Sequence, residues 1–162
     1  MSECDPEKID DIAEQLIHGD VGKKFKVILG GGRNMFLNDT QFDGDGKRGN
    51  RMDGKDLIQE WKTERSQQGK KAFYVWNKDE LTSIDYDNTD YLLGLFDNDH
   101  IPFNLDIIKN NRKRHVPSLS DMTASAIKLL AKEKNGYFLF VEGGRIDSAL
   151  REYNIIFFFC EF

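Results

Sequence analysis

Four short apolar runs alternate along the chain with longer segments whose apolar residues recur at helical spacing. The runs lie at residues 25–29, 72–76, 91–96 and 137–141. Each run has the length of a buried strand, and the segments between the runs are long enough to hold helices. Parallel strands require crossover connections of that kind. The pattern therefore predicts an α/β fold in which a mostly parallel sheet carries helices on both faces.

Helix signals mark the segments between these runs. Asp5 can cap a first helix that has Pro6 at its opening position. A second helix is predicted from about residue 54 to 69, a short third helix begins near Asn77, and a last one follows Pro117. The helices thus fall where crossover connections are needed.

Size and charge narrow the class of protein. The chain has 162 residues, of which 39% are hydrophobic, so it can fold as one domain with its own core. Asp and Glu outnumber Lys and Arg by 28 to 23, and this acidic balance disfavours nucleic acid as a partner. No stretch approaches the ~20 apolar residues of a membrane span. The start of the chain also lacks the basic-then-apolar pattern of a signal peptide.

A glycine triplet, Gly30 to Gly32, follows the first apolar run and precedes Arg33. Backbone amides of such a triplet can cradle a phosphate, because no side chain blocks the approach. The triplet lacks the spacing of both common nucleotide-binding fingerprints. A tight turn at the end of a strand is therefore the favoured interpretation, and a phosphate cradle is the alternative.

Two carboxylates follow the last apolar run. Glu142 comes directly after the run and is followed by two glycines. Asp147 lies five residues after Glu142. If the run is a strand, both side chains converge at its tip, where oxygen ligands suit Mg²⁺ and a carboxylate among nitrogen ligands suits Zn²⁺. In the alternative, Glu142 pairs with Arg145 or Arg33. The spacing alone does not separate these two interpretations.

Two weaker motifs lie in the segment after the glycine triplet. Asp43 to Gly46 is similar to the start of a calcium-binding loop, but the closing glutamate of a 12-residue loop is absent. We interpret this stretch as a solvated acidic turn. Asn38, Asp39 and Thr40 form a glycosylation sequon, with Asn38 as the candidate acceptor if the chain is secreted.

Six motifs occur in an order that resembles the middle of an animal alkaline phosphatase, over roughly residues 4–147. They are GGGRNM (30–35), RMDGKDL (51–57), YVWN (74–77), LGLFD (93–97), PSLSDM (117–122) and FLFVEGGRID (138–147). The resemblance implies part of the alkaline phosphatase fold and a metal-dependent hydrolase of phosphomonoesters. It further implies a homodimer that is secreted or lipid-anchored at the cell surface.

The resemblance also implies metal ligands. In that family a serine nucleophile acts between two Zn²⁺ ions near a Mg²⁺ site. By position, Glu142 matches a Mg²⁺ ligand and Asp147 matches a Zn²⁺ ligand. A calcium site would use the carbonyl of Phe96 and the carboxylate of Asp97. The nucleophile and the other zinc and magnesium ligands match no residue here, so no catalytic residue is assigned to this chain.

The chain departs from the family pattern directly after Asp147. Family members continue with His-Gly-His-His, whereas residues 148–151 are Ser-Ala-Leu-Arg, and a guanidinium cannot ligate a metal. Gln41 and Val116 also stand where the family often has acids, which counts against calcium. We therefore expect residues 1–147 to be a partial alkaline phosphatase domain and residues 148–162 to be a divergent tail. The expected product is truncated and inactive, and the alternative is a non-catalytic metal- or phosphate-binding α/β module.

Overall fold

The fold is built on a three-stranded parallel sheet. A computed structural model describes residues 10–112 and 115–151. Strands β1 (Val27–Gly30), β2 (Ala72–Val75) and β3 (Tyr91–Leu95) lie in the order β1-β3-β2, and both pairings are parallel. The predicted α/β class and the first three strands are therefore confirmed.

The central strand β3 is buried on both faces of the sheet. Leu92 and Leu93 point to opposite faces, and neither side chain is exposed to solvent. Gly94 is required by close packing, because a Cβ atom there would lie 2.7 Å from Cδ2 of Leu29 on the neighbouring strand. Apolar side chains therefore pack against both faces of β3, and the close packing leaves no room for a side chain at residue 94.

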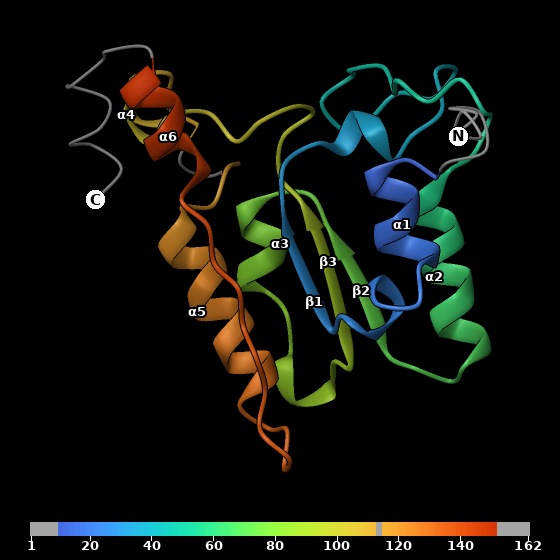
Figure 1. The fold of residues 1–162 in the computed structure, drawn as a ribbon. Helices are drawn as coiled ribbons and strands as arrows, with labels where there is room; N and C mark the ends of the chain where they lie inside the picture. The colour runs from blue at the N-terminus through green and yellow to red at the C-terminus, as the bar shows by residue number, and fades with distance from the viewer. Residues whose placement is uncertain (1–9, 113–114, 152–162) are drawn as a thin grey trace, which may run out of the picture.

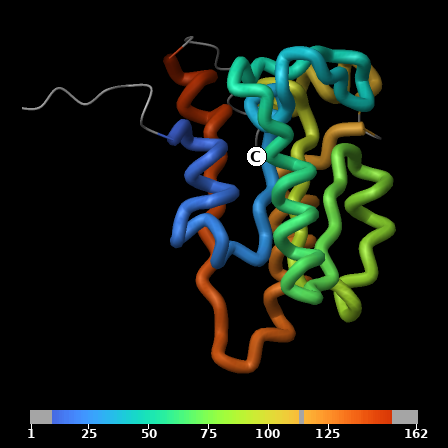
Figure 2. The backbone as a smooth tube through the Cα atoms, turned by 90° about the vertical axis from the view of Figure 1, so that its right-hand side faces the viewer, coloured from blue at the N-terminus to red at the C-terminus, as the bar shows by residue number. Residues whose placement is uncertain are grey.

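Helices cover the two faces of the sheet, as predicted (Figure 1). Helices α1 (Ile12–His18) and α2 (Leu57–Gln67) cover one face, and α3 (Lys78–Thr82) and α5 (Leu119–Leu130) cover the other. Ile17, Leu57 and Trp61 join Leu93 in the first core. The second core contains Leu81 and Leu129. Figure 2 shows the same layers from the side of α2.

The other helical segments are short and lie outside these layers or between their elements. They are the 3-10 helices η2 (Gly22–Lys24), η3 (Arg33–Met35) and η4 (Tyr86–Asn88) and the helices α4 (Asn104–Lys109) and α6 (Gly144–Arg151). Within the described residues, no helix has the length and apolar character that crossing a membrane would require.

Side chains that begin the helices explain several of their boundaries. The carboxylate of Asp11 accepts the N–H of Glu14, so α1 begins at Ile12. Ser118 and Asp121 form a reciprocal capping box at the start of α5. The predicted cap at Asp5 and most of the predicted tail, residues 152–162, lie outside the described residues.

The prediction of a fourth strand over residues 137–141 is wrong, because this segment joins no ladder. The side chains of the segment alternate as in a strand. Leu139 packs against the second core, while Phe138 is 89% exposed and Phe140 is also exposed. The local pattern therefore fits a strand, but β1 pairs only with β3 in the described sheet. A strand forms only where a neighbour completes its hydrogen bonds.

Candidate functional site

The loops that leave β1 and β3 meet at the carboxyl end of the sheet. The chain leaves β1 toward the face covered by α2 and leaves β3 toward the face covered by α5 (Figure 1). Ligands of parallel sheets commonly bind at such a switch point. Here the Gly32 N–H donates to the Asp99 carbonyl over 2.6 Å, and the Arg33 N–H donates to the Asp97 carbonyl over 3.1 Å. Backbone hydrogen bonds therefore close the crevice.

The glycine triplet is a tight turn at the end of a strand, as the favoured interpretation held. A Cβ atom on Gly31 would lie 2.3 Å from the Asp99 carbonyl oxygen, and Gly32 has a φ of 77°. Both positions therefore favour glycine for reasons of packing and backbone conformation. The amides of Gly32 and Arg33 already donate within the protein, so they are not free to cradle a phosphate.

Inorganic phosphate should therefore leave the melting temperature of this protein unchanged. A ligand raises that temperature only by binding the native state, and the turn offers phosphate few free amide donors. Thermal unfolding in phosphate, compared with unfolding in sulfate at the same ionic strength, measures the effect. A phosphate-specific rise in melting temperature would contradict this assignment of the turn.

Arg33 holds the acidic segment 43–46 against the sheet. Its side chain is 1% exposed; Nε donates to the Leu95 carbonyl over 3.0 Å, and Nη1 lies 2.8 Å from Oδ2 of Asp43. The guanidinium also lies 5.3 Å from the centre of the Trp76 ring. The interpretation of residues 43–46 as a solvated turn is therefore wrong at Asp43, whose side chain is as buried as that of its partner.

Asp97, at the carboxyl end of β3, is also buried and paired. Its carboxylate lies 2.8 Å from Nη2 of Arg112, and the Phe96 N–H donates to the Gly30 carbonyl over 2.8 Å. Sequence analysis placed Asp97 correctly at the end of a strand but did not identify Arg112 as its partner. Arg112 was visible only as one member of the basic run at residues 112–115, without any signal for a pairing.

Glu142 and Asp147 do not converge at a strand tip. Glu142 lies in an extended segment and is exposed, whereas Asp147 lies on α6 with its side chain 66% exposed. The Asp147 carboxylate lies 2.8 Å from Nε of Arg151, one helical turn away. The chain brings the two carboxylates to the same end of the fold but leaves each in its own surroundings.

The alternative pairing of Glu142 with Arg145 or Arg33 is wrong in this structure. Arg145 donates from Nε to the Ile101 carbonyl over 2.7 Å, and its guanidinium lies 4.4 Å from the centre of the Phe103 ring. Arg33 pairs with Asp43. Arg145 therefore attaches the start of α6 to the loop after β3, which places the segment 142–147 at the carboxyl end of the sheet.

The side chains present do not match the ligand sets of the metals that the resemblance implies. Zn²⁺ in catalytic sites takes three protein ligands, and Ca²⁺ takes six to eight oxygens. Among residues 10–112 and 115–151, no group of three or more His, Cys, Asp or Glu side chains could hold a metal ion. Glu142, Asp147 and Asp97 therefore do not fit a complete metal site within this part of the chain.

The side chain of Asn38, the candidate glycosylation acceptor, accepts two hydrogen bonds from Thr40. Oδ1 of Asn38 lies 2.9 Å from the Thr40 N–H and 2.6 Å from the Thr40 hydroxyl. Nδ2 of Asn38 lies 3.5 Å from the Gly54 carbonyl. These contacts describe a local turn, and glycosylation of Asn38 stays a prediction.

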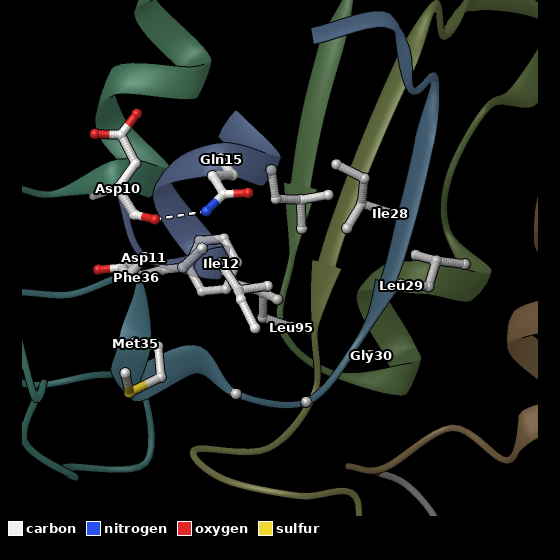
Figure 3. Close-up of a pocket in the computed structure, with 14 residues that line it drawn as sticks. Asp10, Asp11, Ile12, Gln15, Ile28, Leu29, Gly30, Met35, Phe36 and Leu95 are labelled. Atoms are coloured by element: carbon white, nitrogen blue, oxygen red, sulfur yellow. Dashed lines mark hydrogen bonds between the residues drawn. The ribbon is translucent and has the colours of Figure 1, made fainter. Parts of the chain in front are cut away.

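A cavity of about 740 Å³ lies between α1 and β1 (Figure 3). Its walls are mainly apolar side chains from α1, β1 and η3 and backbone atoms of the glycine turn. The polar residues Asp10, Asp11 and Gln15 lie at one side, where Gln15 donates to the Asp10 carbonyl. Asp11, one of the two carboxylates at that side, caps α1 and lies 2.8 Å from Nη1 of Arg51, so its contacts are structural.

Comparison with known proteins gives one consistent result. A family model described as alkaline phosphatase matches residues 1–159. The membrane-bound alkaline phosphatase of Bombyx mori is 45% identical over 145 residues, which are 90% of this chain and 26% of that protein. The tissue-nonspecific isozyme of alkaline phosphatase from Homo sapiens is 41% identical over 147 residues, which are 88% of this chain and 27% of that protein.

A solved structure agrees with the sequence relatives. The crystal structure of Thermus thermophilus alkaline phosphatase is similar to this fold with a TM-score of 0.70 and 29% identity. The similarity covers 92% of this chain and 26% of the solved chain. These 162 residues therefore span about a quarter of the length of the relatives and the solved structure that they match.

Proposed function

The chain belongs to the alkaline phosphatase family, and from that premise we propose that it supplies the Glu142–Asp147 segment of a metal-dependent phosphomonoester hydrolase. Two features support the proposal. Glu142 and Asp147 match family ligands by position, and Arg145 attaches their segment to the carboxyl end of the sheet. Carboxylates at that end of a parallel sheet are where the chemistry of such folds takes place.

We propose further that the 162 residues alone do not hydrolyse phosphomonoesters. The observation that carries this proposal is the donor set: Asp147 is ion-paired with Arg151 and belongs to no group of three or more ligating side chains among the described residues. A phosphatase that depends on two metals needs charge stabilisation on both the attacking and the leaving oxygen. Because the present residues do not complete a metal site, we assign no catalytic step to them.

Turnover of p-nitrophenyl phosphate at alkaline pH with added Zn²⁺ and Mg²⁺ tests this proposal. We expect no hydrolysis above the rate without protein. The Asp147→Ala variant serves as the control, because its substitution removes the carboxylate of this chain that matches a zinc ligand of the family. Turnover in the unmodified chain that disappears in Asp147→Ala would overturn the proposal and establish a working site.

Substitution of Arg151 offers a direct measure of what the zinc position lacks. Residues 147 and 151 lie four apart on α6, so an imidazole at 151 reaches the same side of the helix as the Asp147 carboxylate. Imidazole nitrogen and carboxylate oxygen are both zinc ligands. We expect Arg151→His to bind zinc about tenfold more tightly than Arg151→Gln, a difference of roughly 1.4 kcal/mol.

Isothermal titration of both variants with zinc chloride measures this difference. Arg151→Gln is the matched control, because it removes the guanidinium without supplying an imidazole. Equal zinc affinities in the two variants would show that Asp147 is not available as a ligand, and the proposed role of Asp147 would fail.

The remaining family properties are proposals as well. We propose phosphomonoesters as substrates of the complete enzyme, a homodimer as its assembly, and the cell surface or the exterior as its location. The name of the Bombyx mori relative, a membrane-bound alkaline phosphatase, supports the proposed location. The backbone hydrogen bonds of the glycine turn disfavour the alternative of a phosphate-binding module.

A further inference from the structure

Two cationic side chains from separate segments hold the carboxylate of Asp97. The Asp97 side chain is 6% exposed; Oδ2 lies 2.8 Å from Nη2 of Arg112, and Oδ1 lies 3.7 Å from Nζ of Lys47. Each carboxylate oxygen therefore has its own positive partner. The two cations together carry the charge of one divalent metal ion.

The backbone fixes the position of Arg112. Helix α4 ends just before it, Asn111 has a φ of 55°, and the Arg112 N–H donates to the Ile107 carbonyl over 2.9 Å. The Arg112 carbonyl in turn accepts the N–H groups of His115 and Val116. Arg112 is therefore hydrogen-bonded through both its N–H and its carbonyl, and its guanidinium reaches the Asp97 carboxylate.

The loop that begins at Asp97 also contacts the segment that carries Lys47. Nδ2 of Asn98 lies 3.4 Å from Oδ2 of Asp43 and 3.4 Å from the Arg48 carbonyl. The Asp97 carbonyl accepts the Arg33 N–H. Asp97 therefore lies where three segments meet: the acidic turn, the loop after β3 and the end of α4.

The residues around Asp97 do not fit a divalent cation. Gln41 uses its side-chain amide on Oδ2 of Asp56 over 2.7 Å and its side-chain oxygen on the Asn38 N–H. Val116 is buried and has no side-chain oxygen to offer. Calcium needs six to eight oxygen ligands, and no group of three or more His, Cys, Asp or Glu side chains in the described part of the chain could hold a metal ion.

We propose that Arg112, together with Lys47, serves as the permanent counter-charge of Asp97, so that this end of the fold is stable without calcium. A buried carboxylate must be paired with a positive charge, because its solvation by water has been lost. A guanidinium keeps its charge at every accessible pH and forms directional hydrogen bonds to carboxylates. The ion pairs of Asp97 with Arg112 and Lys47 therefore join the three segments without a metal ion from solution.

The first test is thermal unfolding of the full chain in calcium chloride and in the chelator EGTA. We expect the two melting temperatures to agree, since both oxygens of the Asp97 carboxylate already have cationic partners. A calcium-dependent rise in the melting temperature of the unmodified chain would overturn the proposal. This readout needs no enzymatic activity, so it stands or falls independently of the proposed phosphatase role.

The second test removes the guanidinium. Arg112→Gln should lower the melting temperature by about 4–8 °C, since it leaves a buried carboxylate with a distant ammonium alone. The matched control is Arg48→Gln, which breaks an exposed pair with Asp39 and should change the melting temperature far less. Equal effects of the two variants would overturn the proposal.

The third test asks whether the loss arises from charge or from packing. Asp97→Asn in the Arg112→Gln background removes the carboxylate that lacks its main partner. We expect this double variant to recover most of the lost melting temperature. If the double variant melts no higher than Arg112→Gln, the guanidinium acts through packing and the proposed counter-charge role is wrong.

Discussion

Replacing Arg33 by methionine should lower the free energy of unfolding by about 3–5 kcal/mol, the cost of breaking a buried ion pair. The guanidinium and the carboxylate of Asp43 are both almost fully buried, so the substitution leaves a negative charge without water and without its partner. It also removes the hydrogen bond to the Leu95 carbonyl and the contact with the Trp76 ring. Chemical denaturation of the variant and the unmodified chain measures the change.

Two controls make this prediction specific to the buried charge. Arg48→Met breaks an exposed pair and should cost no more than about 1 kcal/mol. The double variant Arg33→Met, Asp43→Leu should recover much of the loss, because apolar side chains can replace both partners of a buried pair. A loss in Arg33→Met as small as that in Arg48→Met would contradict the structural role of this pair.

Gly31→Ala should lower the free energy of unfolding by about 3 kcal/mol, near the upper end of the usual cost of overpacking. The added Cβ atom would lie 2.3 Å from the Asp99 carbonyl oxygen and 3.0 Å from the Ile101 nitrogen. These neighbours are backbone atoms, so they cannot rotate away as a side chain would. The turn after β1 must then separate from the loop after β3, and the hydrogen bonds between them are weakened.

The preceding glycine supplies the matched control. A Cβ atom on Gly30 meets nothing within 4 Å, so Gly30→Ala should change the free energy of unfolding by less than about 0.5 kcal/mol. Urea denaturation of both variants tests the difference. Equal destabilisation by the two substitutions would indicate that the close approach at Gly31 does not limit the turn.

The fold could be predicted as far as local patterns determine it. Three strands and the helices α2 and α5 were predicted from apolar spacing and from residues such as Ser118 that begin a helix. The error at residues 137–141 has a physical cause. The segment has the apolar, aromatic composition of a strand, including Phe138 and Phe140. A strand also needs a neighbouring strand, and the sequence of the segment does not show whether it has one.

The candidate site was less predictable for a related reason. The glycine turn was identified because the need for glycine is local. The pairs Arg33–Asp43 and Asp97–Arg112 were missed because each charge has its partner on another segment, 10 and 15 residues away. Acidic runs are usually solvated, so composition alone assigned Asp43 to the surface, and it gave no partner for Arg112. Only the meeting of loops at one end of the sheet buries them.

The order of strands has a consequence for synthesis on the ribosome. β1 and β2 never touch, since each pairs only with β3, which is the last of the three to be translated. Val27, Ile28 and Leu29 therefore leave the exit tunnel long before any strand can receive them. Until Leu95 has emerged, the nascent chain must carry unpaired apolar segments, the condition under which chaperones are most often needed.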